Sequence, residues 1–421
     1  MSKKWRPMTP AEKYYAFLDR VSPMNLFLVA DLDRALDIDR VADCWPRFVR
    51  QRALPRVQVG ADLTIGDGGA VGEFTGMSLP SDGWNAQLSR EARAPFGPDR
   101  PMRLCYFASP DEGRARLAFV VHHAVTDGRV GVAELQAFIR MLDGQDLEPQ
   151  PEPPVVVPAA KTYPWQQHRT ELSTLVQELR ARNEAAGPPD PPDWPRPDRA
   201  REPRFFSLLL DGAPAAGFLA AARQHRTRAY AAMAATWLRI AARRLAGSDG
   251  GTLQLATPVD ITGDNPHDPV PAAPVTSIVA NRFRVTPGAG WELAAEINAA
   301  LDASLERGEG ELFFHLTRAA HITDPDAGAR VVAAAIASAP PAISVTNLGV
   351  VDPGSDPPWL RTMCGYLAPT PNQVIFVSGL GYRGRLVHSI SSDDTQLAPE
   401  IAAEFVAGYA ERVRTIGAGA R

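Results

Sequence analysis

Apolar residues recur along the first part of the chain at spacings that distinguish helices from strands. Tyr14, Phe17 and Leu18 follow the spacing of an amphipathic helix. The preceding segment Thr9-Pro10-Ala11-Glu12 has the form of a capping box with proline at the first helical position, so we expect a helix to begin there. Strands are expected at residues 25–32, 102–108 and 116–121, and a helix at residues 39–53, with Pro46 causing a kink or a late start. A further helix is expected after His122-His123, with Leu135, Phe138, Ile139 and Leu142 facing inward.

The second half of the chain also alternates between the two spacings. Strands are expected at residues 205–210, 252–258, 275–285, 342–346, 373–377 and 385–390. Helices are expected at residues 229–245, 291–305, 311–321, 327–337 and 400–416. Because helices and strands alternate in both halves without a repeating period, the pattern predicts two layered α/β (α+β) domains.

Proline clusters divide the chain. The 39 prolines are about twice the usual share, and two runs of them fill residues 149–158 and 188–203. Each proline ring fixes φ and removes an N–H donor, so these runs predict extended connectors, with a helix at 165–182 between them. We therefore expect an N-terminal lobe at 1–165, a proline-rich linker at 166–204 and a C-terminal lobe at 205–421.

Composition narrows the class of protein. With 421 residues, 45% of them hydrophobic, and a net charge of -4, the chain is expected to fold into a packed core and not to bind nucleic acid. No apolar run reaches the roughly 20 residues of a membrane helix, so we expect no membrane partner and a cytoplasmic monomer. Three cysteines are too few and too scattered for a disulfide framework or a zinc finger.

The densest chemical signal is the segment His122-His123-Ala124-Val125-Thr126-Asp127-Gly128. Two histidines end a buried strand, and aspartate and glycine follow before a helix. They could be satisfied core groups, but placing two imidazoles there is costly without a use. A metal site is the other alternative. Adjacent residues of a strand point to opposite faces, so both rings cannot bind one ion, and we predict no metal.

This segment resembles the HHxxxDG signature of the superfamily that contains chloramphenicol acetyltransferase, condensation domains of non-ribosomal peptide synthetases, polyketide-associated acyltransferases and wax-ester synthases. The resemblance continues in the Thr9–Glu12 opening, in residues 50–56 as a degraded RHxxLR box, and in Ser344-Val345-Thr346-Asn347-Leu348-Gly349 as the SNxG or DFGWG element. It implies two chloramphenicol-acetyltransferase-like lobes arranged as a V around a central tunnel.

The resemblance also implies roles for the residues. His123 would be the general base, with His122, Asp127 and Gly128 completing the catalytic segment. A neutral imidazole can take a proton from a hydroxyl or amine, which then attacks a thioester carbonyl. Backbone N–H groups near Gly128, at the start of the following helix, could stabilise the oxyanion.

Two elements depart from the family pattern. The box has Gln51 and Pro55 where histidine and arginine are usual, so the expected arginine partner of Asp127 is Arg56 or Arg52, with Arg284 as a further candidate. In the third element, Thr346, Asn347 and Gly349 are expected to contact substrate, although Asn347 could equally be a turn residue. This element is closer to ester-forming members, which favours alcohol acceptors.

Residues 379–384 match the dinucleotide pattern GxGxxG. Strand-like runs lie on both sides of them, whereas a dinucleotide site needs a helix on the second side. We therefore predict a hairpin turn and no bound cofactor.

The sequence thus predicts an acyltransferase of natural-product biosynthesis with a small-molecule acceptor. The donor would be acyl-CoA or the phosphopantetheinyl thioester of an acyl or peptidyl carrier protein. No GxSxG segment supports a covalent serine mechanism, so direct transfer is expected. Two alternatives stay open: a non-transferring protein of the same fold that docks a carrier or shapes a pocket for another reaction, and a thioester hydrolase.

Overall fold

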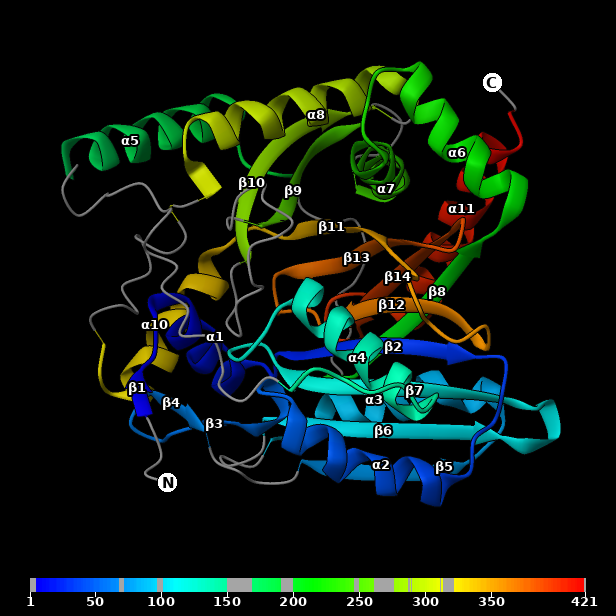
Figure 1. Cartoon of the computed structure of the whole chain (residues 1–421). Coiled ribbons are helices and arrows are strands. Elements are labelled where there is room, and N and C mark those ends of the chain that lie inside the picture. The colour runs from blue at the N-terminus through cyan, green and yellow to red at the C-terminus, as the bar shows by residue number, and fades with distance from the viewer. Residues whose placement is uncertain are drawn as a thin grey trace.

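The computed structural model describes residues 5–67, 72–96, 101–149, 169–190, 200–245, 250–260, 276–286, 288, 290–310, 312 and 322–419. Two large sheets lie one above the other, each covered by helices (Figure 1). The mixed α/β class is therefore as predicted. The expected helix at 311–321, apart from Leu312, and the prolines at 151–158 and 191–197 lie outside the described residues.

The first sheet has five strands in the order β12-β2-β7-β6-β5, and only β5 and β6 are parallel neighbours. Its strands are β2 (Asn25–Leu32), β5 (Glu73–Ser78), β6 (Met102–Ser109), β7 (Arg114–His122) and β12 (Leu360–Leu367). Helices α2 (Ile38–Gln51) and α4 (Gly128–Leu142) pack on one face around Trp45, Phe48, Phe119 and Phe138. Helix α2 runs through Pro46 and has no late start. Helix α3 (Trp84–Arg93) packs on the other face.

The second sheet has six strands in the order β10-β9-β11-β13-β14-β8. They are β8 (Pro203–Leu210), β9 (Gly251–Asp260), β10 (Thr276–Val285), β11 (Ala342–Val351), β13 (Gln373–Tyr382) and β14 (Arg385–Asp393). One face packs against α6 (Gly212–Gln224), α7 (Ala229–Leu245), α8 (Trp291–Glu306) and α11 (Pro399–Gly417). Helix α5 (Arg169–Ala185) follows the first proline run and lies beyond the end of α8 (Figure 1).

Successive residues of the central strands alternate between the helix-covered face and the face turned toward the first sheet. On β11, Ile343 and Val345 belong to the core under the helices. Ala342 and Thr346 line the space on the opposite side of the sheet. The strand period of two thus gives the second sheet one apolar face for folding and a second face made of smaller and more polar residues.

Three elements connect the part of the molecule built on the first sheet with the part built on the second. Strand β12 follows most of the second sheet in sequence but pairs with β2, so it completes the first sheet. Helix α1 (Pro10–Val21) packs against α10 (Pro325–Ser338), where a Cβ on Gly328 would lie 2.5 Å from the Phe17 ring. The predicted lobe boundaries stay a prediction; these exchanges show that residues from both ends of the chain build the region between the sheets.

Local signals explain which elements were predicted. The capping box at Thr9 is present, α7 spans 229–245 as expected, and the GxGxxG segment is the β13–β14 hairpin turn, with positive φ at Arg383 and Gly384. Several elements were missed, namely α3, α6, β5, β12 and a small sheet of β1 (Trp5–Pro7), β4 (Thr64–Asp67) and β3 (Val57–Val59).

Candidate active site

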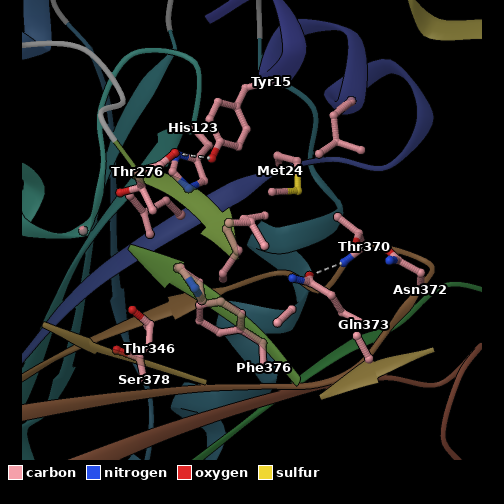
Figure 2. Close-up of a pocket in the computed structure, with 18 of the residues that line it drawn as sticks. Tyr15, Met24, His123, Thr276, Thr346, Thr370, Asn372, Gln373, Phe376 and Ser378 are labelled. Atoms are coloured by element: carbon pink, nitrogen blue, oxygen red, sulfur yellow. Dashed lines mark hydrogen bonds between the residues drawn. The ribbon is translucent and has the colours of Figure 1, made fainter. Parts of the chain in front are cut away.

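His123 lies directly after β7, at one wall of a cavity of about 270 Å³ between the two sheets (Figure 2). The cavity is also lined by residues of α1, α10, β9, β10, β11 and β13. Strand β7 is buried along most of its length, so its end carries the imidazole into the interior without a flexible loop. The predicted base and the cavity therefore coincide.

One hydrogen bond fixes the tautomer of His123. Its Nδ1 lies 2.9 Å from the backbone oxygen of Thr126. A carbonyl oxygen only accepts, so Nδ1 carries the hydrogen, and in the neutral ring Nε2 keeps an in-plane lone pair. The short turn between His123 and Thr126 thus sets which nitrogen can receive a proton.

The surroundings of His123 keep the ring uncharged. It is 7% exposed, and burial lowers its pKa from 6.5 to about 4. The Tyr15 ring stacks on it with a centroid separation of 4.2 Å and an interplanar angle of 11°. The Tyr15 hydroxyl donates to the Thr276 carbonyl at 3.4 Å, so helix α1 meets β10 beside the imidazole (Figure 2). His123 is therefore a neutral, rigidly held acceptor at neutral pH.

His122 differs from its neighbour in position and tautomer. Its Nδ1 accepts from the Ala124 N–H at 3.0 Å, so the neutral ring carries hydrogen on Nε2, which lies 3.4 Å from Asp19. Burial acts to raise the Asp19 pKa, but His122, the Met24 N–H and Arg201 together lower it. His122 does not line the cavity, so the structure separates it from the space that His123 borders.

Asp127 and Gly128 start helix α4. The Asp127 carboxylate is the N-cap and accepts from the N–H groups of Arg129 and Val130 at 3.1 and 3.2 Å. The N–H groups of Arg129 and Val130 are therefore already bound to the Asp127 carboxylate. The Gly128 N–H, which was also expected to face an oxyanion, is not among the N–H groups that this carboxylate caps. A Cβ on Gly128 would lie 2.8 Å from Leu348 Cδ2, so a larger residue there requires the end of the Leu348 side chain to move.

The arginines expected to pair with Asp127 make contacts elsewhere in the fold, and the predicted pairing with Arg56 stays a prediction. Arg52 forms a two-pronged ion pair with Glu134 of α4, at 2.5 and 2.9 Å. Arg56 donates to the Arg50 carbonyl. Arg284 is exposed and lies eight residues along β10 from Thr276, about 26 Å at the usual strand rise. Arg284 thus lies at the far end of β10 from the Thr276 that borders the cavity, whereas Arg52 is bound to helix α4 through Glu134.

The third element supplies one cavity residue of the three expected. Thr346 lines the cavity, as does Leu348. Asn347 is exposed, and its side-chain oxygen accepts from the Gly349 N–H at 3.0 Å. Of the two alternatives given for Asn347, this geometry is that of a turn residue. Gly349 has φ 82°, which favours glycine. The register shift between Asn347 and Val350 is the local cause of this turn.

Most of the lining residues carry no motif. Tyr15, Gln254, Thr276, Gln373 and Ser378 all line the cavity. For the four strand residues, only the alternation of β9, β10 and β13 could have indicated their direction, and it does not indicate which sheet face borders a cavity; Tyr15 lies on α1 beside the apolar stripe of that helix. Sequence reasoning therefore missed the wall opposite His123.

The part of the chain that the structure describes contains no group of three or more histidine, cysteine, aspartate or glutamate side chains that could hold a metal ion. Within that same part, no helix has both the length and the apolar character to cross a membrane.

Comparisons with known proteins concern the class of protein and the fold. Residues 199–363 match the family model described as phthiocerol/phthiodiolone dimycocerosyl transferase C-terminus. A search of curated protein sequences gave no match.

Solved structures with the same fold span nearly the whole chain. Polyketide synthase associated protein 5 from Mycobacterium tuberculosis has a TM-score of 0.64 at 15% identity, over 98% of both chains. The first condensation domain of the calcium-dependent antibiotic synthetase has a TM-score of 0.70 at 13% identity, over 99% of this chain and 96% of that one. The trichothecene 15-O-acetyltransferase from Fusarium sporotrichioides has a TM-score of 0.70 at 12% identity, over 98% and 96%.

Proposed function

Because residues 199–363 match a transferase family model and the chain has the fold of acyltransferases and condensation domains, we propose that it moves an acyl group from a thioester to a hydroxyl acceptor, with His123 as general base. The observation that carries this proposal is the Nδ1–Thr126 hydrogen bond, which leaves Nε2 as the proton acceptor at the cavity.

The proposed step uses the chain's own groups. His123 Nε2 takes the proton of the acceptor hydroxyl while its oxygen bonds to the thioester carbonyl carbon. The Gly128 N–H is the proposed donor to the resulting oxyanion. When the tetrahedral intermediate collapses, the carbon–sulfur bond breaks, and the imidazolium returns its proton to the thiolate. The products are an ester and a free thiol.

The environment of His123 suits a base that acts only during transfer. The ring is buried and stacked on Tyr15, so it stays neutral before substrate reacts. The donor is proposed to be acyl-CoA or an acyl carrier protein thioester, since polyketide synthase associated protein 5 and the condensation domain lie among the structural neighbours. Both donors supply the same thioester chemistry to this mechanism.

The test offers the protein acyl-CoA thioesters of two to ten carbons together with primary alcohols, and follows ester by mass spectrometry and released thiol with a colorimetric reagent. His123→Ala is expected to lower turnover about 10²- to 10⁴-fold. His225→Ala, which changes an exposed histidine stacked on Trp291, serves as the matched control and should retain activity.

Unchanged turnover in His123→Ala would reject the base and favour a scaffold or pocket role. Thiol release that does not depend on the alcohol, with free acid as product, would instead assign a thioester hydrolase.

A further inference from the structure

Two hydroxyl groups stand next to each other on the cavity wall formed by the second sheet. Thr346 of β11 and Ser378 of β13 are direct partners in the parallel register, and both line the cavity. Side chains of register partners leave the same face of a sheet about 5 Å apart. Figure 2 shows the two side by side, across the cavity from His123.

Ser378 is buried but lacks a hydrogen-bond partner. It is 2% exposed, and its Oγ is unsatisfied among the residues that the structure describes. Ser344, two residues before Thr346 on the same face, differs because its Oγ accepts from Gln373 Nε2 at 3.0 Å. An unmet buried hydroxyl is unfavourable. The Ser378 Oγ is shielded in this conformation, so a rotation of its side chain toward the cavity would let a ligand group on this wall recover that loss.

The described lining of the cavity carries no lysine, arginine, aspartate or glutamate side chain. Its ionisable groups are His123, whose pKa burial lowers to about 4, and tyrosines such as Tyr14, whose pKa burial raises to about 12. All are neutral at pH 7. A charged ligand group would therefore lose its hydration without gaining an opposite charge.

We propose that Thr346 and Ser378 form a recognition subsite for an uncharged oxygen substituent, such as a hydroxyl, ether or carbonyl, on an otherwise apolar substrate. This inference rests on the proposed function, because the substrate is taken to be the acyl or acceptor group held at His123. It assigns specificity to residues that take no part in the proton transfer. Ligands with an ammonium or carboxylate group at that position are excluded.

The test measures binding without turnover. Equilibrium dialysis compares 1-octanol with the series of octanediols from 1,2 to 1,8, so that one member places its second hydroxyl at the subsite. At least one diol is expected to bind the wild type about 2- to 10-fold more tightly than 1-octanol. Ser378→Ala should remove this preference and leave 1-octanol binding unchanged. The matched control is Ser391→Ala, which alters another buried, unpartnered serine, on β14, that does not line the cavity.

The proposal is overturned if no diol binds better than 1-octanol, or if the preference survives in Ser378→Ala. Equally tight binding of 8-hydroxyoctanoate or 8-amino-1-octanol would overturn its charge exclusion. His123→Ala should keep the diol preference, so the subsite stands if acyl transfer is never observed. Thr346→Val, which replaces the other hydroxyl of the subsite with a methyl group, should reduce the diol preference, whereas the Ser391→Ala control should not.

Discussion

On one wall of the cavity, polar groups of residues 122–128 form hydrogen bonds within a single short segment. On the other, Thr346 and Ser378 come together from strands that are 32 positions apart in sequence. His123 is bonded to Thr126 and Asp127 caps its own helix, whereas the Ser378 hydroxyl waits for a partner. The wall that carries the proposed base is thus pre-organised by local contacts, and the wall that carries the proposed recognition subsite still has an unsatisfied hydroxyl.

The two walls differ in when their hydrogen bonds form. A proton acceptor must hold one tautomer and one orientation, so its hydrogen bonds are made before substrate arrives. A recognition group gains most when its bond forms only with the correct ligand, because the buried group is otherwise unpaired. Perturbing the first wall should therefore change turnover, and perturbing the second should change selectivity.

After loss of the proposed base itself, the largest effect is expected where the walls touch, at Gly128. In Gly128→Ala the added methyl group would lie 2.8 Å from Leu348 Cδ2, so the leucine must move. Overpacking of this kind costs about 1–3 kcal/mol, which corresponds to roughly 5- to 150-fold in kcat/KM if the cost falls on the reacting geometry. Steady-state kinetics measure it.

A double variant checks the cause. Leu348→Ala in the Gly128→Ala background removes the clash and should restore most of kcat/KM. Gly408→Ala on α11, where an added Cβ meets no atom within 4 Å, should have no effect. A loss that persists in the double variant would show that backbone conformation, and not the contact with Leu348, requires glycine.

The next effect concerns the cap of α4. Asp127→Ala removes the acceptor for two N–H groups and is expected to cost about 0.5–2 kcal/mol of unfolding free energy. Asp127→Asn keeps an acceptor oxygen and should lose less. Asp211→Ala changes the N-cap of α6, whose side chain makes no capping bond, and should be neutral. Denaturant midpoints of the three variants measure this; equal losses at positions 127 and 211 would contradict it.

Tyr15 tests whether stacking positions the imidazole. Tyr15→Ala should lower kcat about 2- to 13-fold, because an aromatic pair contributes about 0.5–1.5 kcal/mol beyond its buried area. It should also raise the His123 pKa by admitting water. Tyr15→Phe removes only the 3.4 Å bond to Thr276 and should keep both values near the wild type. If Tyr15→Phe is as slow as Tyr15→Ala, the hydroxyl and not the ring carries the effect.

The same contrast explains what the sequence could reveal. Residues 122–128 are contiguous, so their motif predicted His123 and the helix after it. Strand alternation predicted that His122 points away from His123, but not that it contacts Asp19, because that contact depends on how β7 meets α1. Ser378 has no local signature, since its position depends on the pairing of β11 with β13. Likewise, the apolar run of β12 gives no sign that it joins the first sheet.

The smallest effect is expected between pH 8 and pH 5, where an unperturbed histidine base would lose most of its activity. With a pKa of about 4, His123 remains about 90% neutral at pH 5, so kcat with an alcohol acceptor should fall less than 2-fold. With a base of pKa 6.5, kcat would fall about 30-fold over that range.

The stability of the fold must be measured over the same pH range. Burial lowers the folded-state pKa of His123 to about 4 and that of His388 to about 3, so the unfolded chain binds more protons below pH 6.5. Stability therefore decreases as pH falls from 6.5 toward those values. Circular dichroism at each pH separates unfolding from titration. A limb near pH 6.5 in fully folded protein would show that His123 is hydrated during turnover, and the catalytic wall would then be less closed than its contacts indicate.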